Sequence, residues 1–213
     1  MNVFQYIVSS KKALWLLAGA ASGAASVGVM VLGEKSWGTI KILGLETIDD
    51  NTMFFPPGCI FGLTIAILLF FSSKIRSFWR SIILIGMSGI AHYVAFEIAF
   101  RIAVFLNYNG DYSLKLIPAG LLAGAIGAAI LGGSILLIYP IEARWRFAVK
   151  IISVGALFGT LLFLVSWVGK KTNNFIGHSL LYLPWQAAVA YCLSLFYAPV
   201  QENQTKLSSQ EQH

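Results

Sequence analysis

The chain has 213 residues, of which 57% are hydrophobic and only 11% are charged. A typical soluble domain is about 45–50% apolar and about 25% charged. So few charges cannot cover a globular surface, which excludes a soluble enzyme, a disordered regulator and a disulfide-stapled secreted module. We expect an all-α protein, a polytopic membrane helical bundle with most of its length in the lipid bilayer.

The net charge of +6 comes from 15 basic and 9 acidic residues. In a soluble protein this excess would suggest nucleic acid as a partner. Here the basic residues cluster at the ends of apolar runs, so the excess is assigned to membrane orientation. The two cysteines, Cys59 and Cys192, lie inside apolar segments and form no CxxC or Cys/His cluster. We therefore expect no metal, no cofactor, no disulfide and no nucleic acid partner.

Six apolar segments reach, or nearly reach, the roughly 20 helical residues that cross the bilayer core. They cover residues 13–33, 58–73, 81–106, 116–139, 149–169 and 179–199. The second is short and starts at Pro56-Pro57-Gly58, because proline is tolerated in the first turn of a helix. Phe54 and Phe55 extend this span at its outer end. Residues 1–200 are thus expected to form one six-helix transmembrane domain.

Basic loop residues predict the orientation of the chain. One side of the bundle holds nine of them, namely Lys11, Lys12, Lys74, Arg76, Arg80, Arg144, Arg146, Lys150 and Lys206. The other side holds five, so the positive-inside rule places the first side and both termini in the cytoplasm. Interfacial tryptophans are expected near the inner ends (Trp15, Trp79, Trp145) and the outer ends (Trp167, Trp185). Residues 201–213 hold one leucine and no aromatic residue, which predicts a disordered cytosolic tail.

Three pairs of short strings occur in the same order in the two halves of the chain. Residues 16–20 (LLAGA) recur as 121–125, residues 58–62 (GCIFG) match 155–159 (GALFG), and residues 94–96 (VAF) match 189–191 (VAY). If this is a duplication, its units are 13–106 and 116–199, and three spans per unit invert the second copy. Inverted repeats are common in transporters, with a site at the repeat interface. The alternative is a coincidence of composition in a simple six-helix bundle.

Small residues at four-residue spacing mark the first and fourth predicted helices. Gly19 and Gly23 share a face of the first, and Gly120 and Gly124 share a face of the fourth. Such faces allow close backbone approach, which helices in lipid need because no hydrophobic force drives them together. We expect the two helices to pack tightly, including on each other around a pseudo-twofold axis. A homodimer face is the alternative. The candidate kink points are Gly132, Gly133, Ser134 and Pro184.

Polar side chains in the third span are the main candidates for a binding site. Tyr93, Glu97 and Arg101 follow one another at four-residue intervals and share a helix face, while His92 lies on another. A lone charge in hydrocarbon costs at least about 2.5–3.5 kcal/mol. Glu97 therefore needs a partner, and Arg101 is placed to pair with it, with Tyr93 as a hydrogen-bond donor. Both a self-neutralised structural pair and a group that binds substrate or a proton fit this pattern.

Polar residues of five spans lie at a similar depth below the outer surface, counted at about 1.5 Å per residue. They are Ser26, Thr64, Glu97, Thr160 and Gln186. This favours a polar cavity open to the outside, with Glu97, Arg101, Tyr93, His92 and Gln186 as its binding residues. The alternative is that the serine and threonine hydroxyls bond their own backbone.

Three functions remain compatible with the sequence. The leading hypothesis is a transporter or solute-binding membrane protein for an ion or small polar solute, with Glu97 binding it and Arg101 tuning the charge. The second is a non-catalytic membrane subunit or assembly factor that binds partner helices. The third is an intramembrane enzyme using His92 or Ser88. Residues 86–89 (GMSG) resemble the GxSG string of rhomboid proteases, but His178 is expected too far from Ser88, so an enzyme is not expected.

Overall fold

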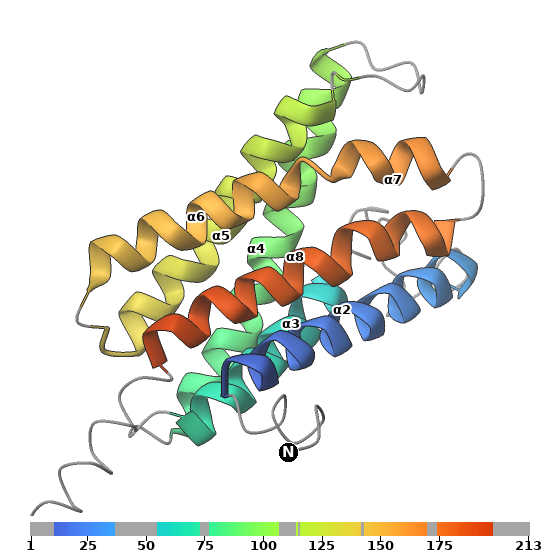
Figure 1. The fold of residues 1–213 in the computed structure, drawn as a ribbon. Coiled ribbons are helices and arrows are strands. Elements are labelled where there is room, and N and C mark those ends of the chain that lie inside the picture. Colours follow the sequence, from blue (N-terminus) through green and yellow to red (C-terminus); the bar gives the residue numbers. More distant parts are fainter. Residues whose placement is uncertain are drawn as a thin grey trace, which may run out of the picture.

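The computed structural model describes residues 11–36, 55–72, 77–106, 114, 116–141, 143–169 and 174–197. Within these ranges every regular element is a helix (Figure 1). The helices are α2 (Lys11–Ser36), α3 (Phe55–Ser72), α4 (Phe78–Phe105), α5 (Leu116–Ile138), α6 (Arg144–Gly159), α7 (Leu162–Gly169) and α8 (Asn174–Tyr197). Six segments are long and apolar enough to cross a membrane. The predicted fold class, an all-α multi-pass membrane bundle, is therefore confirmed. The predicted tail, 201–213, lies outside the described residues.

Most helices begin and end close to the predicted limits. α3 begins at Phe55, so Pro56 and Pro57 occupy its first turn. The N–H groups of a first turn have no acceptor within the helix, so proline, which lacks an N–H, is tolerated there. α5 continues without interruption through residues 132–134, and α8 continues through Pro184. These candidate kink points therefore do not end a helix, because membrane helices tolerate glycine and proline when neighbours satisfy the backbone.

The fifth span is broken, although the sequence predicted one helix over residues 149–169. The backbone amides of Thr160 and Leu161 bond three residues back, to the carbonyl oxygens of Leu157 at 3.3 Å and Phe158 at 3.1 Å. This is 3₁₀ spacing, and it separates α6 from α7. The Thr160 hydroxyl also donates to the Leu157 carbonyl oxygen at 2.6 Å. Hydropathy missed the break because the apolar residues continue across it.

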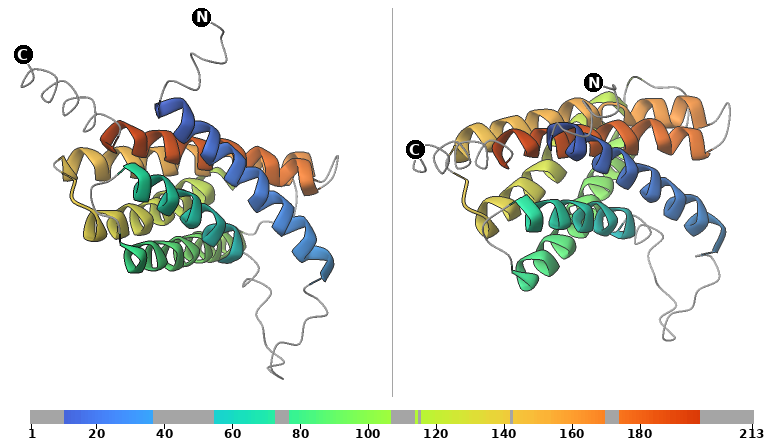
Figure 2. Two further views of the ribbon diagram at one scale, coloured as in Figure 1. Left: turned by 90° about the horizontal axis from the view of Figure 1, so that it is seen from below. Right: turned by 60° about the horizontal axis from the view of Figure 1, so that its bottom comes forward.

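The helices form two layers of three. One layer contains α2, α8 and the α6–α7 segment, and the other contains α3, α4 and α5 (Figure 2). The layers join along two edges, where α2 packs on α3 and α5 packs on α6. Each span therefore packs on the spans before and after it in the chain, and α2 closes the ring by packing on α8.

Glycines on α2 bring it close to α8. A Cβ atom built on Gly19 would lie 2.6 Å from the carbonyl oxygen of Gln186, and one built on Gly23 would lie 2.7 Å from the Cα atom of Leu183. Both distances are too short for a real Cβ atom, so only glycine permits this spacing. The small-residue face of α2 is thus occupied by a helix of the same chain.

Glycines on α5 allow close packing against α6. Cβ atoms on Gly120 and Gly124 would collide with the carbonyl oxygens of Gly159 and Gly155 in α6. The carbonyl groups therefore point at glycine Cα atoms, an arrangement that brings weak Cα–H···O contacts as well as close packing. The expectation that the first and fourth helices pack on each other through these faces is wrong, because each face is covered by another helix.

Basic side chains gather at one end of the bundle, which we call the basic end. It holds Lys12, Arg80, Arg144, Arg146 and Lys150, near the starts of α2, α4 and α6. The Arg80 guanidinium donates from Nη1 to the Ile138 carbonyl oxygen at 2.9 Å and so satisfies a carbonyl at the end of α5. The Lys150 ammonium lies 5.6 Å from the ring centre of Phe196, near the end of α8.

Candidate functional site

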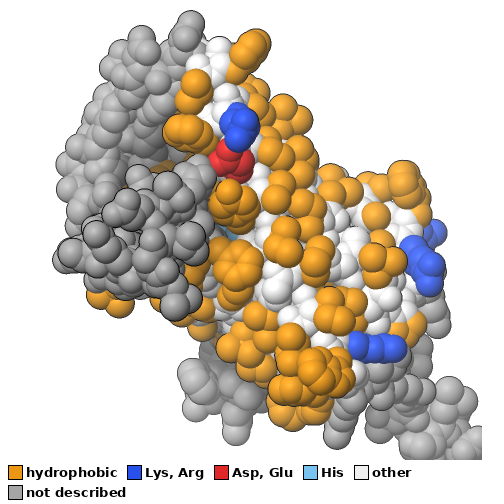
Figure 3. Space-filling model, turned by 180° about the vertical axis from the view of Figure 1, so that it is seen from behind, with side chains coloured by type: hydrophobic (Ala, Val, Ile, Leu, Met, Phe, Trp, Pro, Cys, Tyr) orange, Lys and Arg blue, Asp and Glu red, His pale blue; other side chains and the backbone are white. Residues whose placement is uncertain are grey.

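Glu97 and Arg101 form the predicted ion pair, and they do so on the outside of the bundle. Arg101 donates a hydrogen bond from Nε to Glu97 Oε1 at 2.6 Å, and its Nη2 atom forms an ion-pair contact with the same oxygen at 2.6 Å. The Arg101 side chain is 76% exposed and that of Glu97 is 20% exposed. In Figure 3 an acidic side chain lies next to a basic one, with hydrophobic side chains beside them. The pair lines a surface hollow with Phe100, Val104 and Phe105, close to the end of α4.

Gln186 lies elsewhere, in a buried joint between three helices. Its Nε2 group donates to the Ser26 hydroxyl at 3.0 Å, and that hydroxyl donates to the Pro57 carbonyl oxygen at 3.2 Å. We call these three residues the Gln186 joint, which links α8, α2 and the first turn of α3. Gln186 Oε1 and the nearby Ser22 hydroxyl are buried and have no hydrogen-bond partner in the described part of the chain.

The predicted outward cavity that joins Glu97, Arg101, Tyr93 and Gln186 is therefore not formed. Glu97 and Arg101 lie on the surface, while Gln186 is enclosed by its joint and is fully buried. Tyr93 lines neither the hollow of the ion pair nor the cavity described next, and no described hydrogen bond joins it to Glu97. Residues of different helices that lie at the same depth in the membrane do not necessarily face one another.

The predicted layer of hydroxyl groups is also incomplete. Thr64 donates to the carbonyl oxygen of Ile60 at 3.1 Å, one turn back in its own helix. Thr160 bonds the backbone at the break in the fifth span. Only Ser26 reaches a group on another helix through its side chain. The alternative that hydroxyls bond their own backbone is thus correct for both threonines.

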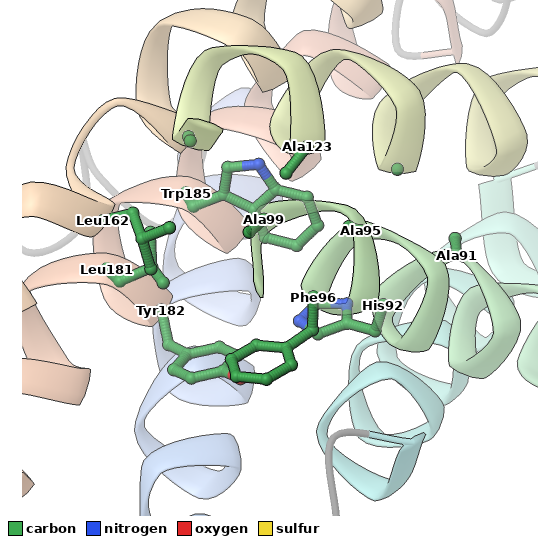
Figure 4. A pocket seen from close by; sticks show the side chains of 13 residues that line it. Ala91, His92, Ala95, Phe96, Ala99, Ala123, Leu162, Leu181, Tyr182 and Trp185 are labelled. Atoms are coloured by element: carbon green, nitrogen blue, oxygen red, sulfur yellow. The ribbon is translucent and has the colours of Figure 1, made fainter. Parts of the chain in front are cut away.

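A partly open cavity of about 80 Å³ lies at His92, and we call it the His92 cavity (Figure 4). Its walls come from α4, α5 and α8, together with both sides of the break between α6 and α7. Its lining residues are Ala91, His92, Ala95, Phe96, Ala99, Gly120, Ala123, Gly127, Gly159, Leu162, Leu181, Tyr182 and Trp185. The positions on α4, α5 and α8 place it toward the end of the bundle opposite the basic end.

Ring contacts hold the His92 side chain at the cavity wall. Its imidazole stacks on Tyr182, with ring centres 5.6 Å apart and planes 12° apart, and meets Trp185 edge-on at 5.0 Å and 78°. On the other side, a Cβ atom on Gly58 would lie 2.6 Å from the Cβ atom of His92, so glycine lets α3 approach. No hydrogen bond joins the imidazole to another described residue.

The lining of the His92 cavity decides what it can bind. No aspartate, glutamate, lysine or arginine is among the lining residues, and most of them are alanine, glycine or leucine. An unpaired ion is strongly disfavoured in such surroundings. The volume of about 80 Å³ is several times the roughly 10–15 Å³ that one water molecule needs. The cavity therefore suits a small neutral molecule better than an ion.

Sequence reasoning identified His92 but missed its two ring partners. Tyr182 and Trp185 are three residues apart, a spacing that places both on one helix face. That signal was available, but only the packing of α8 on α2, α6 and α7 directs this face toward His92. Trp185, expected at the outer interface, is instead buried beside the imidazole.

Ser88 has no hydrogen-bonded catalytic partner among the described residues. Its hydroxyl is buried and makes no hydrogen bond to the described residues. The His178 ring instead lies 6.3 Å from the Tyr182 ring, at the start of α8. Among the described residues no three His, Cys, Asp or Glu side chains are grouped to hold a metal ion.

Comparison of the chain with models of protein families, with curated proteins and with solved structures gives no match.

Proposed function

We propose that the chain is a small carrier, or a solute-binding membrane protein, whose binding site is the His92 cavity. The supporting observation is that this cavity lies directly beside an interrupted span. Gly159, the last residue of α6, and Leu162, the first of α7, both line the cavity. Interrupted helices are frequent at the binding sites of transporters.

An inverted repeat remains part of this proposal. Short or interrupted spans at corresponding positions in two halves point to a binding site. The second span is short and begins with two prolines, and the fifth is interrupted after Gly159. The matching strings at 58–62 and 155–159 fall in these two spans. Their glycines, however, contact different neighbours, α4 in one half and α5 in the other, so the proposed symmetry concerns the order of the helices.

The proposed orientation places the basic end in the cytoplasm, which the positive-inside rule supports. The His92 cavity then lies nearer the outer surface. A neutral solute would enter it from that side, and rearrangement at the break between α6 and α7 would expose it to the other.

Thiol accessibility tests the carrier proposal without knowledge of the solute. Cys59→Ala and Cys192→Ala provide the cysteine-free background, and Ala99→Cys places a thiol in the His92 cavity. A membrane-impermeant maleimide should label it in both right-side-out and inside-out vesicles. The matched control, Ala129→Cys on the exposed face of α5, should react from neither side. Labelling of the cavity thiol from one side only would contradict alternating access.

A second candidate function is a membrane subunit that binds a partner helix. The observation in its favour is the exposed Glu97–Arg101 pair on the outside of α4, beside Phe100 and Phe105, which are 52% and 84% exposed. A partner bound there should co-purify in mild detergent at fixed stoichiometry and be lost in the Glu97→Gln/Arg101→Ala double variant. Because the ion pair does not line the His92 cavity, the same double substitution should leave the labelling of Ala99→Cys unchanged.

A further inference from the structure

The His92 cavity combines aromatic rings with very small side chains. Rings come from His92 and Phe96 on α4 and from Tyr182 and Trp185 on α8. Alanine and glycine make up most of the remaining lining, so α4 and α5 contribute nearly bare backbone surface there. A flat molecule is the shape that contacts both kinds of surface, since aromatic rings pack best in offset-stacked or edge-on arrangements.

Three of the four ring residues also carry a polar group that has no hydrogen-bond partner among the described residues. The His92 imidazole, the Tyr182 hydroxyl and the Trp185 indole N–H make no hydrogen bond with the described residues. None of the three is among the fully buried unpaired atoms of the described residues, so each remains accessible to a bound molecule. The neutral imidazole of His92 has one donor and one acceptor nitrogen, which matches a ligand oxygen that can both accept and donate.

Charge narrows the ligand class further. The lining contains no carboxylate, ammonium or guanidinium group. An ionised ligand would lose its hydration and find no opposite charge, so a neutral compound is required. Ring shape, one polar oxygen and the absence of charge together describe phenols and related cyclic compounds.

We infer that the His92 cavity binds a small, neutral, planar ring compound that carries one hydroxyl oxygen. Its ring packs against Tyr182 and Trp185, and its oxygen forms a hydrogen bond with His92. This inference names the solute class of the site in the proposed function and rests on it.

Four probes of similar size separate the features of this ligand. p-Cresol has the planar ring and the hydroxyl, toluene lacks the hydroxyl, 4-methylcyclohexanol lacks the planar ring, and p-toluate is charged. Binding is measured by equilibrium dialysis against the full chain in nanodiscs, with empty nanodiscs correcting for partition into lipid. p-Cresol should bind about three- to tenfold more tightly than toluene, the gain of one net hydrogen bond. It should also exceed 4-methylcyclohexanol, and p-toluate should show no binding above the empty nanodiscs.

Variants connect this preference to named side chains. His92→Phe keeps a ring beside Tyr182 and removes the nitrogens, so the advantage of p-cresol over toluene should disappear while toluene still binds. The matched control is Tyr93→Phe, which removes a hydroxyl next in sequence but outside the cavity, and should keep the full advantage. An unchanged advantage in His92→Phe would overturn the inference.

Two variants, one that fills the cavity and one that enlarges it, give an independent test. Ala99→Leu fills space in the cavity and should abolish p-cresol binding. Leu162→Ala enlarges the cavity and should allow 2-naphthol to bind at least tenfold better than it binds the unmodified chain. This second variant keeps the test decisive if Ala99→Leu does not fold. Absence of both effects would place the ring compound outside the His92 cavity and overturn the inference.

The failure of this inference can be told apart from the failure of the proposed function. If p-cresol binds no better than toluene and 4-methylcyclohexanol, while Ala99→Cys is still labelled from both sides, the solute class is wrong and the carrier proposal stands. If p-cresol shows the expected preferences and loses them in His92→Phe, while labelling occurs from one side, the ligand class stands and the carrier proposal fails.

Discussion

The contacts of some polar residues could be predicted from the sequence, and those of others could not. The Glu97–Arg101 pair followed from four-residue spacing, because two residues one turn apart on a helix are always neighbours. The bond from Gln186 to Ser26 joins residues 160 positions apart, and no local pattern encodes it. Likewise, His92 was recognisable as a polar residue in an apolar span, but its contacts with Tyr182 and Trp185 depend on how α8 packs.

The Gln186 joint should contribute to stability through paired polar atoms. Ser26→Ala removes the acceptor of the Gln186 amide and should lower the free energy of unfolding by about 1–3 kcal/mol, the cost of an unsatisfied buried donor. Gln186→Leu in the same chain should recover part of that loss, because it removes the orphaned group. Thermal unfolding in detergent measures both. Strictly additive effects would show that the two side chains are not coupled.

Removal of one member of the ion pair should be worse than removal of both. Arg101→Ala removes the ion pair from the Glu97 carboxylate, and we expect a loss of stability on the order of 1 kcal/mol, below the value of about 2.5–3.5 kcal/mol for a charge at the bilayer centre. The Glu97→Gln/Arg101→Ala double variant should be more stable than the single one. The measurement is thermal stability in nanodiscs, and equal or lower stability of the double variant would contradict the pairing.

At the scale of elements, apolar length predicted six spans and their approximate limits. It could do so because a helix in lipid must be long and free of charge whatever its neighbours are. The break at Thr160 was not predictable in this way, since the residues on both sides are apolar. Glycine spacing predicted close packing but not the partner, because a small-residue face is compatible with any helix that presents a matching surface.

Two glycines of α5 provide a matched test of this packing. A Cβ atom on Gly124 would collide with the Gly155 carbonyl oxygen, whereas nothing lies within 4 Å of one on Gly133. Gly124→Ala should therefore destabilise the protein by about 1–3 kcal/mol, as overpacking does. Gly133→Ala should be neutral or stabilising, because alanine favours helix over glycine by about 1 kcal/mol. Thermal unfolding of the two variants side by side gives the comparison, and equal effects would contradict the contact between α5 and α6.

At the scale of the molecule, composition was sufficient to predict a multi-pass helical bundle, and the ring of six spans agrees with it. The binding site was harder to predict, since the predicted polar cavity assumed that side chains at equal depth face a common centre. In the structure the charged pair faces outward, the glutamine is sealed between helices, and the cavity holds rings and small residues. The proposed function follows this cavity and the broken span beside it.

The distance between the outer parts of α4 and α8 tests the proposal of a moving site most directly. Spin labels at Val104 and Phe175, both exposed, in the cysteine-free background report this distance by double electron–electron resonance in nanodiscs. A carrier should show two distance populations, and Ala99→Leu, which fills the cavity, should shift their ratio. A single narrow distance that Ala99→Leu leaves unchanged would contradict the carrier proposal.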